Sequence, residues 1–261
     1  MSSAPTPGEI FDRAVDEGRR RLDQSLLELV STSFIAGFTI VFGVVAFGIV
    51  EAVVEPRFGA VAKIAGALAF GLGVVFLVVG RTELFNENFF DPAAAAVAED
   101  GSWLLPSLLR LWVVTVVLNL IGGVLFALVF AVPGVLPPGT DEALRAFAEE
   151  SADRSIAAWF ASGIAGGALV SMLSFLLVAV DGSGSRIAVA YVAGFLLALG
   201  PFDHVVVTAL HVFFGIQFGA PVGLGTVGAM LTAVTAGNLV GGLGLVTFTH
   251  VAQAMGEGSV A

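Results

Sequence analysis

The chain has 261 residues, of which 57% are hydrophobic and 12% are charged, and its mean hydropathy is +0.98. Ordinary soluble domains carry roughly 25% charged residues, so a compact soluble protein of this composition would have a mostly apolar surface, and we expect a membrane protein instead. The net charge of −10 argues against a nucleic-acid partner, and the absence of cysteine excludes disulfides, thiolate metal sites and thiol nucleophiles.

Residues 1–25 are polar and lack the apolar core of a signal peptide, so we expect an N-terminal arm outside the membrane domain. Five small or apolar residues have the spacing of one face of a short amphipathic helix: Ile10, Phe11, Ala14, Gly18 and Leu22. The densest basic cluster, Arg19 to Arg21, precedes the first apolar segment, and the positive-inside rule therefore places the N-terminus in the cytoplasm.

Four apolar segments are long enough to cross the roughly 30 Å hydrocarbon core, which takes about 20 helical residues. They cover residues 29–50, 111–140, 155–180 and 226–255. Between the second and third of these, alternating acids and alanines predict a short surface helix on the outer face, and residues 181–185 read as a turn.

Two further apolar segments are interrupted. Residues 64–80 are only 17 uncharged residues, about 25 Å of helix, and we expect them to be too short to span alone. Charged side chains follow, and an apolar stretch then continues to residue 98. Residues 187–202 are likewise followed by Asp203 and His204 before apolar sequence resumes to residue 216.

The sequence thus predicts an all-α membrane domain over residues 26–255 with six transmembrane helices, the second and fifth of them interrupted. A short tail, residues 256–261, follows. An even number of crossings places both termini in the cytoplasm.

An internal repeat supports this topology. The segment from Gly80 to Glu83 and that from Gly200 to Asp203 each have an acid three residues after a glycine, 120 residues apart. The sequences Asn119-Leu-Ile-Gly-Gly and Asn238-Leu-Val-Gly-Gly are 119 residues apart. Because each half has three crossings, the two halves must be inverted in the membrane, and such paired interruptions indicate a substrate pathway between them.

Ionisable side chains at the interruptions are functional candidates, because they are costly in hydrocarbon. His204 can exchange a proton near neutral pH, and we favour that role over a neutral histidine bonded to a backbone carbonyl. His211, seven residues later, is interpreted as a packing residue.

We expect Glu83 and Asp203 to cap the broken helices by accepting free backbone N–H groups. Arg81 is expected to pair with a carboxylate, either Glu83 or Glu87, because an unpaired guanidinium at membrane depth is expensive. Asn119 and Asn238 form a separate pair, and they are expected to bond loop backbone across helices.

Enzyme signatures are missing from the sequence: it has no phosphate loop, no HExxH, no GxSxG and no Cys/His cluster. We therefore expect neither an enzyme nor a bound metal or cofactor. A channel or a secondary carrier remains.

Three motifs carry a resemblance to a known family: GRTELFNEN at residues 80–88, FDHVVVTALHVFFG at residues 202–215 and GNLVGG at residues 237–242. Together they resemble the formate/nitrite transporter family, over nearly the whole chain after residue 25. The resemblance implies an aquaporin-like fold, a homopentamer with one pore per protomer in the lipid of the cytoplasmic (inner or plasma) membrane, and small monovalent anions such as formate, nitrite, hydrosulfide or lactate.

Carried over by position, His204 matches the family's central pore histidine and Asn86 the loop position usually occupied by threonine. Phe70, Val74 and Leu197 would line apolar constrictions. The full set of pore candidates is His204, Asn86, Phe70, Val74, Leu197, Phe202 and Thr208.

The sequence also departs from the family pattern. Ser162 stands where a lysine or arginine is common, Gly167 stands where an asparagine is common, and Thr208 likewise replaces an asparagine. Arg81 and Glu87 add charge to a usually neutral segment. Arg81 could therefore attract the anion in place of the cation that is missing at position 162.

Two other interpretations stay open. A neutral-solute channel of aquaporin type would use the same architecture, with His204 only as a hydrogen-bonding filter. A structural or receptor subunit would leave the charges within the membrane unexplained.

Overall fold

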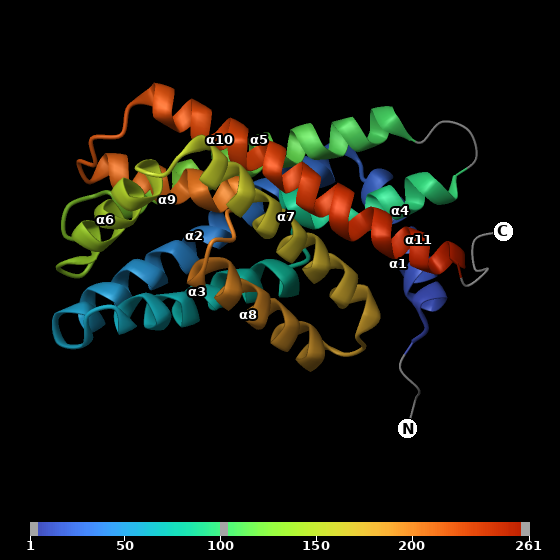
Figure 1. Ribbon diagram of the computed structural model, residues 1–261, viewed down its shortest axis with the longest axis horizontal. Helices are drawn as coiled ribbons and strands as arrows, with labels where there is room; N and C mark the ends of the chain where they lie inside the picture. The colour runs from blue at the N-terminus through green and yellow to red at the C-terminus, as the bar shows by residue number, and fades with distance from the viewer. Residues whose placement is uncertain (1–4, 100–103, 257–261) are drawn as a thin grey trace.

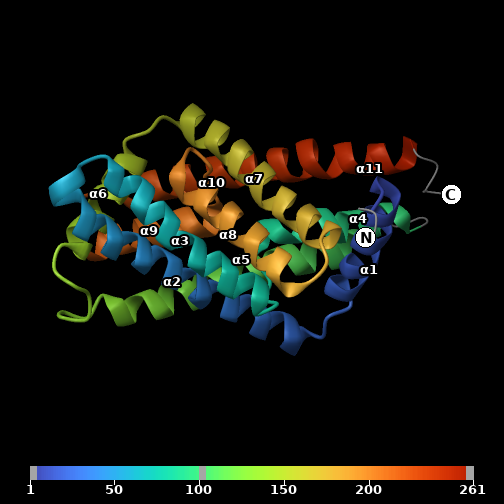
Figure 2. The same cartoon turned by 90° about the horizontal axis from the view of Figure 1, so that it is seen from below.

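The computed structural model describes residues 5–99 and 104–256, and every regular element in these ranges is a helix (Figure 1). Residues 257–261 of the predicted tail lie outside the described residues. The helices form one elongated bundle (Figures 1 and 2). They are α1 (Pro7–Leu22), α2 (Leu26–Phe58), α3 (Val61–Val79), η1 (Phe85–Asn88), α4 (Phe90–Ala98), α5 (Leu105–Phe130), α6 (Thr140–Ala152), α7 (Ile156–Ala179), α8 (Ser183–Leu199), α9 (Val205–Gln217), α10 (Leu224–Leu239), the π-helical η2 (Val240–Thr247) and α11 (Phe248–Gly256).

Five helices of the described ranges are long and apolar enough to cross a membrane: α2, α3, α5, α7 and the continuous run from Leu224 to Gly256. The expectation that α3 is too short was wrong, because it has 19 residues, about 28 Å of helix. Lys63 does not exclude the first turn from the helix, since its exposed side chain extends to Glu150, with Nζ 2.6 Å from Oε2.

Two predicted boundaries need correction. The third apolar segment was expected to run to residue 140, but α5 ends at Phe130. Three prolines follow within the next eight residues, and proline cannot donate a helical hydrogen bond. The predicted turn after α7 is shorter than expected, because α8 already begins at Ser183.

The helices α2 and α7 begin in the same way. The hydroxyl of Ser25 accepts a hydrogen bond from the backbone N–H of Glu28, and the hydroxyl of Ser155 accepts one from the N–H of Ala158. Each serine satisfies a donor that the first helical turn leaves free. Because the two caps are 130 residues apart, they extend the internal correspondence beyond the motifs seen in the sequence.

Glycine allows the closest helix crossings. Gly37 of α2 lies against the backbone of Asn119 in α5, and Gly167 of α7 lies against the backbone of Asn238 in α10. A Cβ atom on either glycine would overlap the backbone oxygen of the asparagine opposite. The two crossings therefore correspond, and both require a residue without a side chain.

The short helices α1 and α6 lie at opposite ends of the bundle (Figures 1 and 2). The five residues of the predicted apolar face of α1 are buried. Gly18 of α1 packs on Ala95 of α4, and Ala148 of α6 packs on Gly215 of α9. These residues are again 130 and 120 positions apart, so the contact of α6 with α9 corresponds in spacing to the contact of α1 with α4.

Candidate functional site

Non-helical backbone follows α3 and α8, and one asparagine holds each of these segments. Beside the first, the Nδ2 group of Asn119 donates to the carbonyl oxygens of Ser33 (2.8 Å) and Glu83 (2.9 Å). Its Oδ1 accepts a hydrogen bond from the N–H of Phe85 at 3.1 Å. Asn119 is fully buried, so all three bonds lie away from solvent.

Asn238 repeats this pattern at the second segment. Its Nδ2 group donates to the carbonyl oxygens of Gly163 (2.8 Å) and Asp203 (2.7 Å). Its Oδ1 accepts from the N–H of Val205 at 3.0 Å. Both asparagines thus fix the backbone on either side of the residue that follows the acid, which is Leu84 in the first half and His204 in the second.

The two acids do not cap the helices, contrary to the sequence-based expectation. The Glu83 carboxylate accepts hydrogen bonds from Gln24 Nε2 at 2.9 Å and Arg20 Nη2 at 3.3 Å. The Asp203 carboxylate accepts from Arg154 Nη2 at 2.7 Å and from the hydroxyl of Ser162. Each acid is held by side chains rather than by free backbone N–H groups.

The cations that pair with the first acidic segment are Arg20 and above all Arg21 of α1, not Arg81. Arg21 Nη2 lies 3.1 Å from Glu87 Oε1 and 3.6 Å from Asp91 Oδ2, and its Nη1 lies 3.4 Å from Glu83 Oε2. Burial alone would lower the pKa of the Arg21 guanidinium, but these three carboxylates raise that pKa well above its usual value. Because Arg21 lies far from these acids in the sequence, spacing along the chain did not indicate this pairing.

Arg81 is exposed and makes no ion pair with a described residue, so the predicted pairing with Glu83 or Glu87 was wrong. Its backbone has φ 51°, in the left-handed region. This conformation follows the end of α3, and the exposed arginine precedes a buried segment.

His204 is the N-cap of α9. Its Nδ1 atom accepts hydrogen bonds from the backbone N–H groups of Val206 (3.2 Å) and Val207 (3.5 Å). The side chain is buried, and its Nε2 atom has no hydrogen-bond partner among the described residues. This capping role was not predicted from the sequence, although an imidazole nitrogen before a helix is a suitable acceptor.

Asn86 lies in η1 and is fully buried. Neither its Nδ2 nor its Oδ1 atom has a hydrogen-bond partner in the described part of the chain. Most buried polar side-chain atoms in proteins are paired. Asn86 and His204 therefore both carry buried polar atoms without a hydrogen-bond partner in the described part of the chain.

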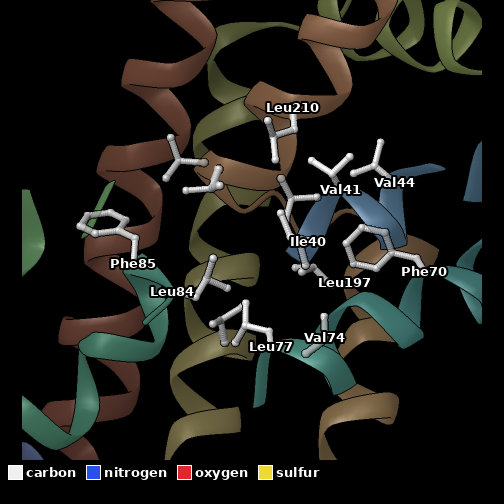
Figure 3. Close-up of a cluster of buried hydrophobic side chains, with 14 of the residues drawn as sticks. Ile40, Val41, Val44, Phe70, Val74, Leu77, Leu84, Phe85, Leu197 and Leu210 are labelled. Atoms are coloured by element: carbon white, nitrogen blue, oxygen red, sulfur yellow. The ribbon is translucent and has the colours of Figure 1, made fainter. Parts of the chain in front are cut away.

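The three predicted constriction residues, Phe70, Val74 and Leu197, lie in one buried apolar cluster (Figure 3). Phe202 is half-buried and packs against this cluster. Thr208 is buried one turn after His204, and its N–H donates to the His204 carbonyl oxygen at 2.8 Å.

His211 lies next to Phe70, with ring centroids 6.1 Å apart, and its ring also contacts Phe47 and Phe147. Its Nδ1 atom is 3.0 Å from the carbonyl oxygen of Val207, and its Nε2 atom lacks a partner among the described residues. The ring lies among aromatic side chains, and the packing role of this residue stays a prediction.

Sequence reasoning missed Arg154, Gln24 and Arg21. One signal could have found the first two: Gln24 and Arg154 each directly precede a serine N-cap, 130 residues apart, and each donates to the acid of its own half. No described group of three or more His, Cys, Asp or Glu side chains could hold a metal ion.

The sequence model of the formate/nitrite transporter family matches residues 8–252. The chain therefore belongs to the formate/nitrite transporter family, whose members are membrane channels and transporters rather than enzymes.

Its curated relatives include the uncharacterized transporter YwcJ of Bacillus subtilis, which is 25% identical over 84% of this chain and 86% of the relative. The inner membrane protein YfdC of Escherichia coli is 22% identical over 89% of this chain and 74% of that protein. An uncharacterized bacterial transporter and a bacterial inner membrane protein are thus similar to the chain over most of its length.

Two solved structures share the fold. An FNT family ion channel superposes with a TM-score of 0.81 at 18% identity, covering 94% of this chain and 98% of that one. A pentameric formate channel with formate bound superposes with a TM-score of 0.74, also at 18% identity, covering 92% and 98%.

Proposed function

We propose that this protein is a channel for small monovalent anions of weak acids, such as formate or nitrite, and that His204 exchanges a proton with them. The observation that carries the proposal is the buried, unpartnered Nε2 atom of His204. Because Nδ1 accepts hydrogen bonds from α9, the neutral ring carries its proton on Nε2. That N–H is a donor with no competing partner in the described chain.

We propose six crossings, with α3–α4 and α8–α9 each forming one interrupted crossing, in two inverted halves of an aquaporin-like domain. The matching bonds of Asn119 and Asn238 support this topology, since each closes the same kind of backbone interruption. Free backbone groups at membrane depth are tolerated where protein satisfies them or where they line a pathway. The residue after the acid differs between halves, and only the second half has a histidine there.

The proposed transport step follows from desolvation. The apolar side chains of Phe70, Val74 and Leu197 strip water from an ion, which disfavours its charged form. A weak-acid anion accepts a hydrogen bond from the Nε2–H of His204 and takes its proton from water relayed to it, or from a His204 ring that water has first protonated to the imidazolium form and that returns to the neutral form on donation. The protonated solute crosses such a constriction as a neutral molecule. Anions of strong acids take up no proton at neutral pH and should pass poorly.

We propose that the protein assembles as a homopentamer in the cytoplasmic membrane with both termini in the cytoplasm. The solved pentameric formate channel supports the assembly. A second support is the row of exposed apolar side chains on α5, among them Leu109, Val113, Val117 and Ile121, which need lipid or a second copy to cover them. Arg13, Arg19, Arg20 and Arg21 of α1 support a cytoplasmic N-terminal end.

A neutral-solute channel is the alternative, and the buried amide of Asn86 is the observation that favours it. An unpartnered amide donor and acceptor suits a hydroxyl or a water molecule as well as an anion. Under this alternative His204 only donates a hydrogen bond.

Flux into liposomes from pH 5 to 8 separates the two functions. The solutes are formate, nitrite, chloride and glycerol. The variants are H204A, H204F and H204N; asparagine is a good N-cap but does not titrate, so H204N preserves the start of α9. The proposal expects formate and nitrite flux in the wild type with a pH dependence that all three variants change, while assembly is retained.

Glycerol flux without anion flux would support the neutral channel instead. Unchanged anion flux and an unchanged pH profile in all three assembled variants would overturn the role of His204. Native mass spectrometry showing a monodisperse monomer or dimer would overturn the pentamer.

A further inference from the structure

We propose that Arg81 and Arg186 form a binding site for a small monovalent oxyanion, a carboxylate or nitrite, in a cavity at the α1 end of the bundle. The inference rests on the proposed function, because the anion would be the transported substrate before it enters the protomer. The site is separate from His204, which lies at the start of α9.

A cavity of about 660 Å³ opens between α1, the end of α3, the end of α7 and the start of α8. Its lining includes five guanidinium groups and four carboxylates, which are Arg13, Arg20, Arg21, Arg81, Arg186, Asp16, Glu17, Asp91 and Asp181. A surplus of cations therefore faces a space far larger than a formate or nitrite ion, so an anion can enter with part of its hydration shell.

Three of the five arginines are already neutralised. Arg13 pairs with Asp181 at 3.1 Å, and Arg20 pairs with Glu17 at 2.7 Å. Arg21 is enclosed by carboxylates, as described above. These three groups maintain the walls of the cavity and are not available to a ligand.

Arg81 and Arg186 have no carboxylate within ion-pair distance among residues 5–99 and 104–256. Arg186 uses Nη1 to donate to the carbonyl oxygen of Leu177 at 3.0 Å, which anchors its side chain and leaves its charge uncompensated. Arg81 follows the end of α3 and Arg186 lies in the first turn of α8, and these two helices pack side by side (Figure 2). A guanidinium group binds a planar oxyanion through two parallel N–H donors.

Arg81 adopts a backbone conformation that is unfavourable for a residue with a side chain. The N–H of Arg81 donates to the carbonyl oxygen of Val78, and the N–H of Thr82 donates to that of Leu77, which closes α3 with a left-handed residue at position 81. Glycine is the usual residue at such a helix end. A strained non-glycine residue next to a cavity is characteristic of functional positions.

Because the backbone of Arg81 is left-handed, one substitution can weaken anion binding without lowering the stability of the fold. R81G removes the cation and relieves the left-handed conformation, so it should unfold no more easily than the wild type. R186Q removes the second cation. R19Q is the matched control, because Arg19 is an exposed arginine of the same end, 3.7 Å from Glu99, and does not line the cavity.

The experiment measures the initial rate of formate flux into liposomes against formate concentration, at constant ionic strength, for the wild type and the three variants. We expect R81G and R186Q each to raise the half-saturating concentration roughly threefold or more, as expected for a half-exposed ion pair. The maximal rate and the pH profile should change little, and R19Q should behave as the wild type. In parallel, sodium formate should raise the unfolding temperature of the detergent-purified wild type, relative to sodium chloride, but not that of R81G.

Wild-type half-saturation and a wild-type formate effect on unfolding in both R81G and R186Q would overturn this site. Absence of formate and nitrite flux in the wild type would instead overturn the proposed function, while the unfolding measurement would still report on the anion site. An equal loss in R19Q would overturn the local site in favour of a general effect of surface charge.

Discussion

Arg154 Nη2 donates a hydrogen bond to Asp203 Oδ2 at 2.7 Å. Asp203 directly precedes His204, the histidine that caps α9. The two side chains are 29% and 16% exposed, so solvent screens the pair only partly. Ser162, at the position where a cation was expected from the family pattern, donates its hydroxyl to the same carboxylate. Arg154, two residues before α7, thus brings a guanidinium group to the carboxylate that Ser162 also bonds.

Removing one partner of this pair should destabilise the protein. R154Q should lower the free energy of unfolding by about 1.5–3 kcal/mol, the range for hydrogen bonds to charged groups. D203N alone should have a similar cost, and the double variant should cost less than the sum of the two single variants. Denaturant unfolding in detergent measures all three. Additive effects would contradict a direct interaction between Arg154 and Asp203.

The two buried asparagines should contribute about equally to the free energy of unfolding. N119A and N238A each remove three hydrogen bonds and leave a buried backbone N–H without a partner, which costs about 1–3 kcal/mol for that group alone. Both variants should therefore be markedly less stable in the same unfolding assay. T235A is the control on α10, because the Thr235 hydroxyl bonds only to Leu231 of its own helix. A stable N238A beside an unstable N119A would contradict the correspondence of the two halves.

Arg21 should hold α1 on the bundle. R21M would leave Glu87 and Asp91 buried without their cation and Glu83 with Arg20 alone, and breaking a buried pair in this way costs about 3–5 kcal/mol. We expect the amides of α1 to exchange with solvent much faster in R21M than in the wild type. R19M should leave the amide exchange of α1 as it is in the wild type, since the exposed contact of Arg19 with Glu99 is weak. Unchanged exchange in R21M would show that apolar packing alone holds α1.

The contribution of Glu17 should depend on pH. Burial would raise the pKa of Glu17, but its hydrogen bond from Arg20 and the charges of Arg20 and Arg21 lower that pKa to about 2, from an ordinary value of 4.5. Because the pKa is depressed in the folded protein, the stabilisation is complete above pH 4.5 and is lost as the pH falls towards 2.

The difference in unfolding free energy between wild type and E17Q measures this contribution. It should be constant between pH 7 and 5 and should shrink steadily below pH 4.5. Other carboxylates of the cluster are present in both proteins, so the difference isolates Glu17. A difference that grows on acidification would have the wrong sign and would contradict the ion-pair assignment.

The sequence by itself determined the membrane class, the helical segments and the positions of the polar interruptions. These properties are local: about 20 uncharged residues suffice for a crossing, and a charge or proline ends an apolar run wherever it occurs. The repeated glycine–acid and asparagine–glycine motifs also placed Asn119 and Asn238 at equivalent positions before any contact was known.

Only the tertiary structure decided which charges meet. Arg81 is two residues from Glu83, yet the left-handed backbone at the end of α3 separates them, whereas Arg21 reaches the same acid from another helix. The stabilisation of a buried charge depends on distances of a few ångströms and on the local exclusion of water. Neither of these follows from the spacing of residues along the chain. For the same reason the capping role of His204 and the pairing of Arg154 with Asp203 emerged only from the folded arrangement.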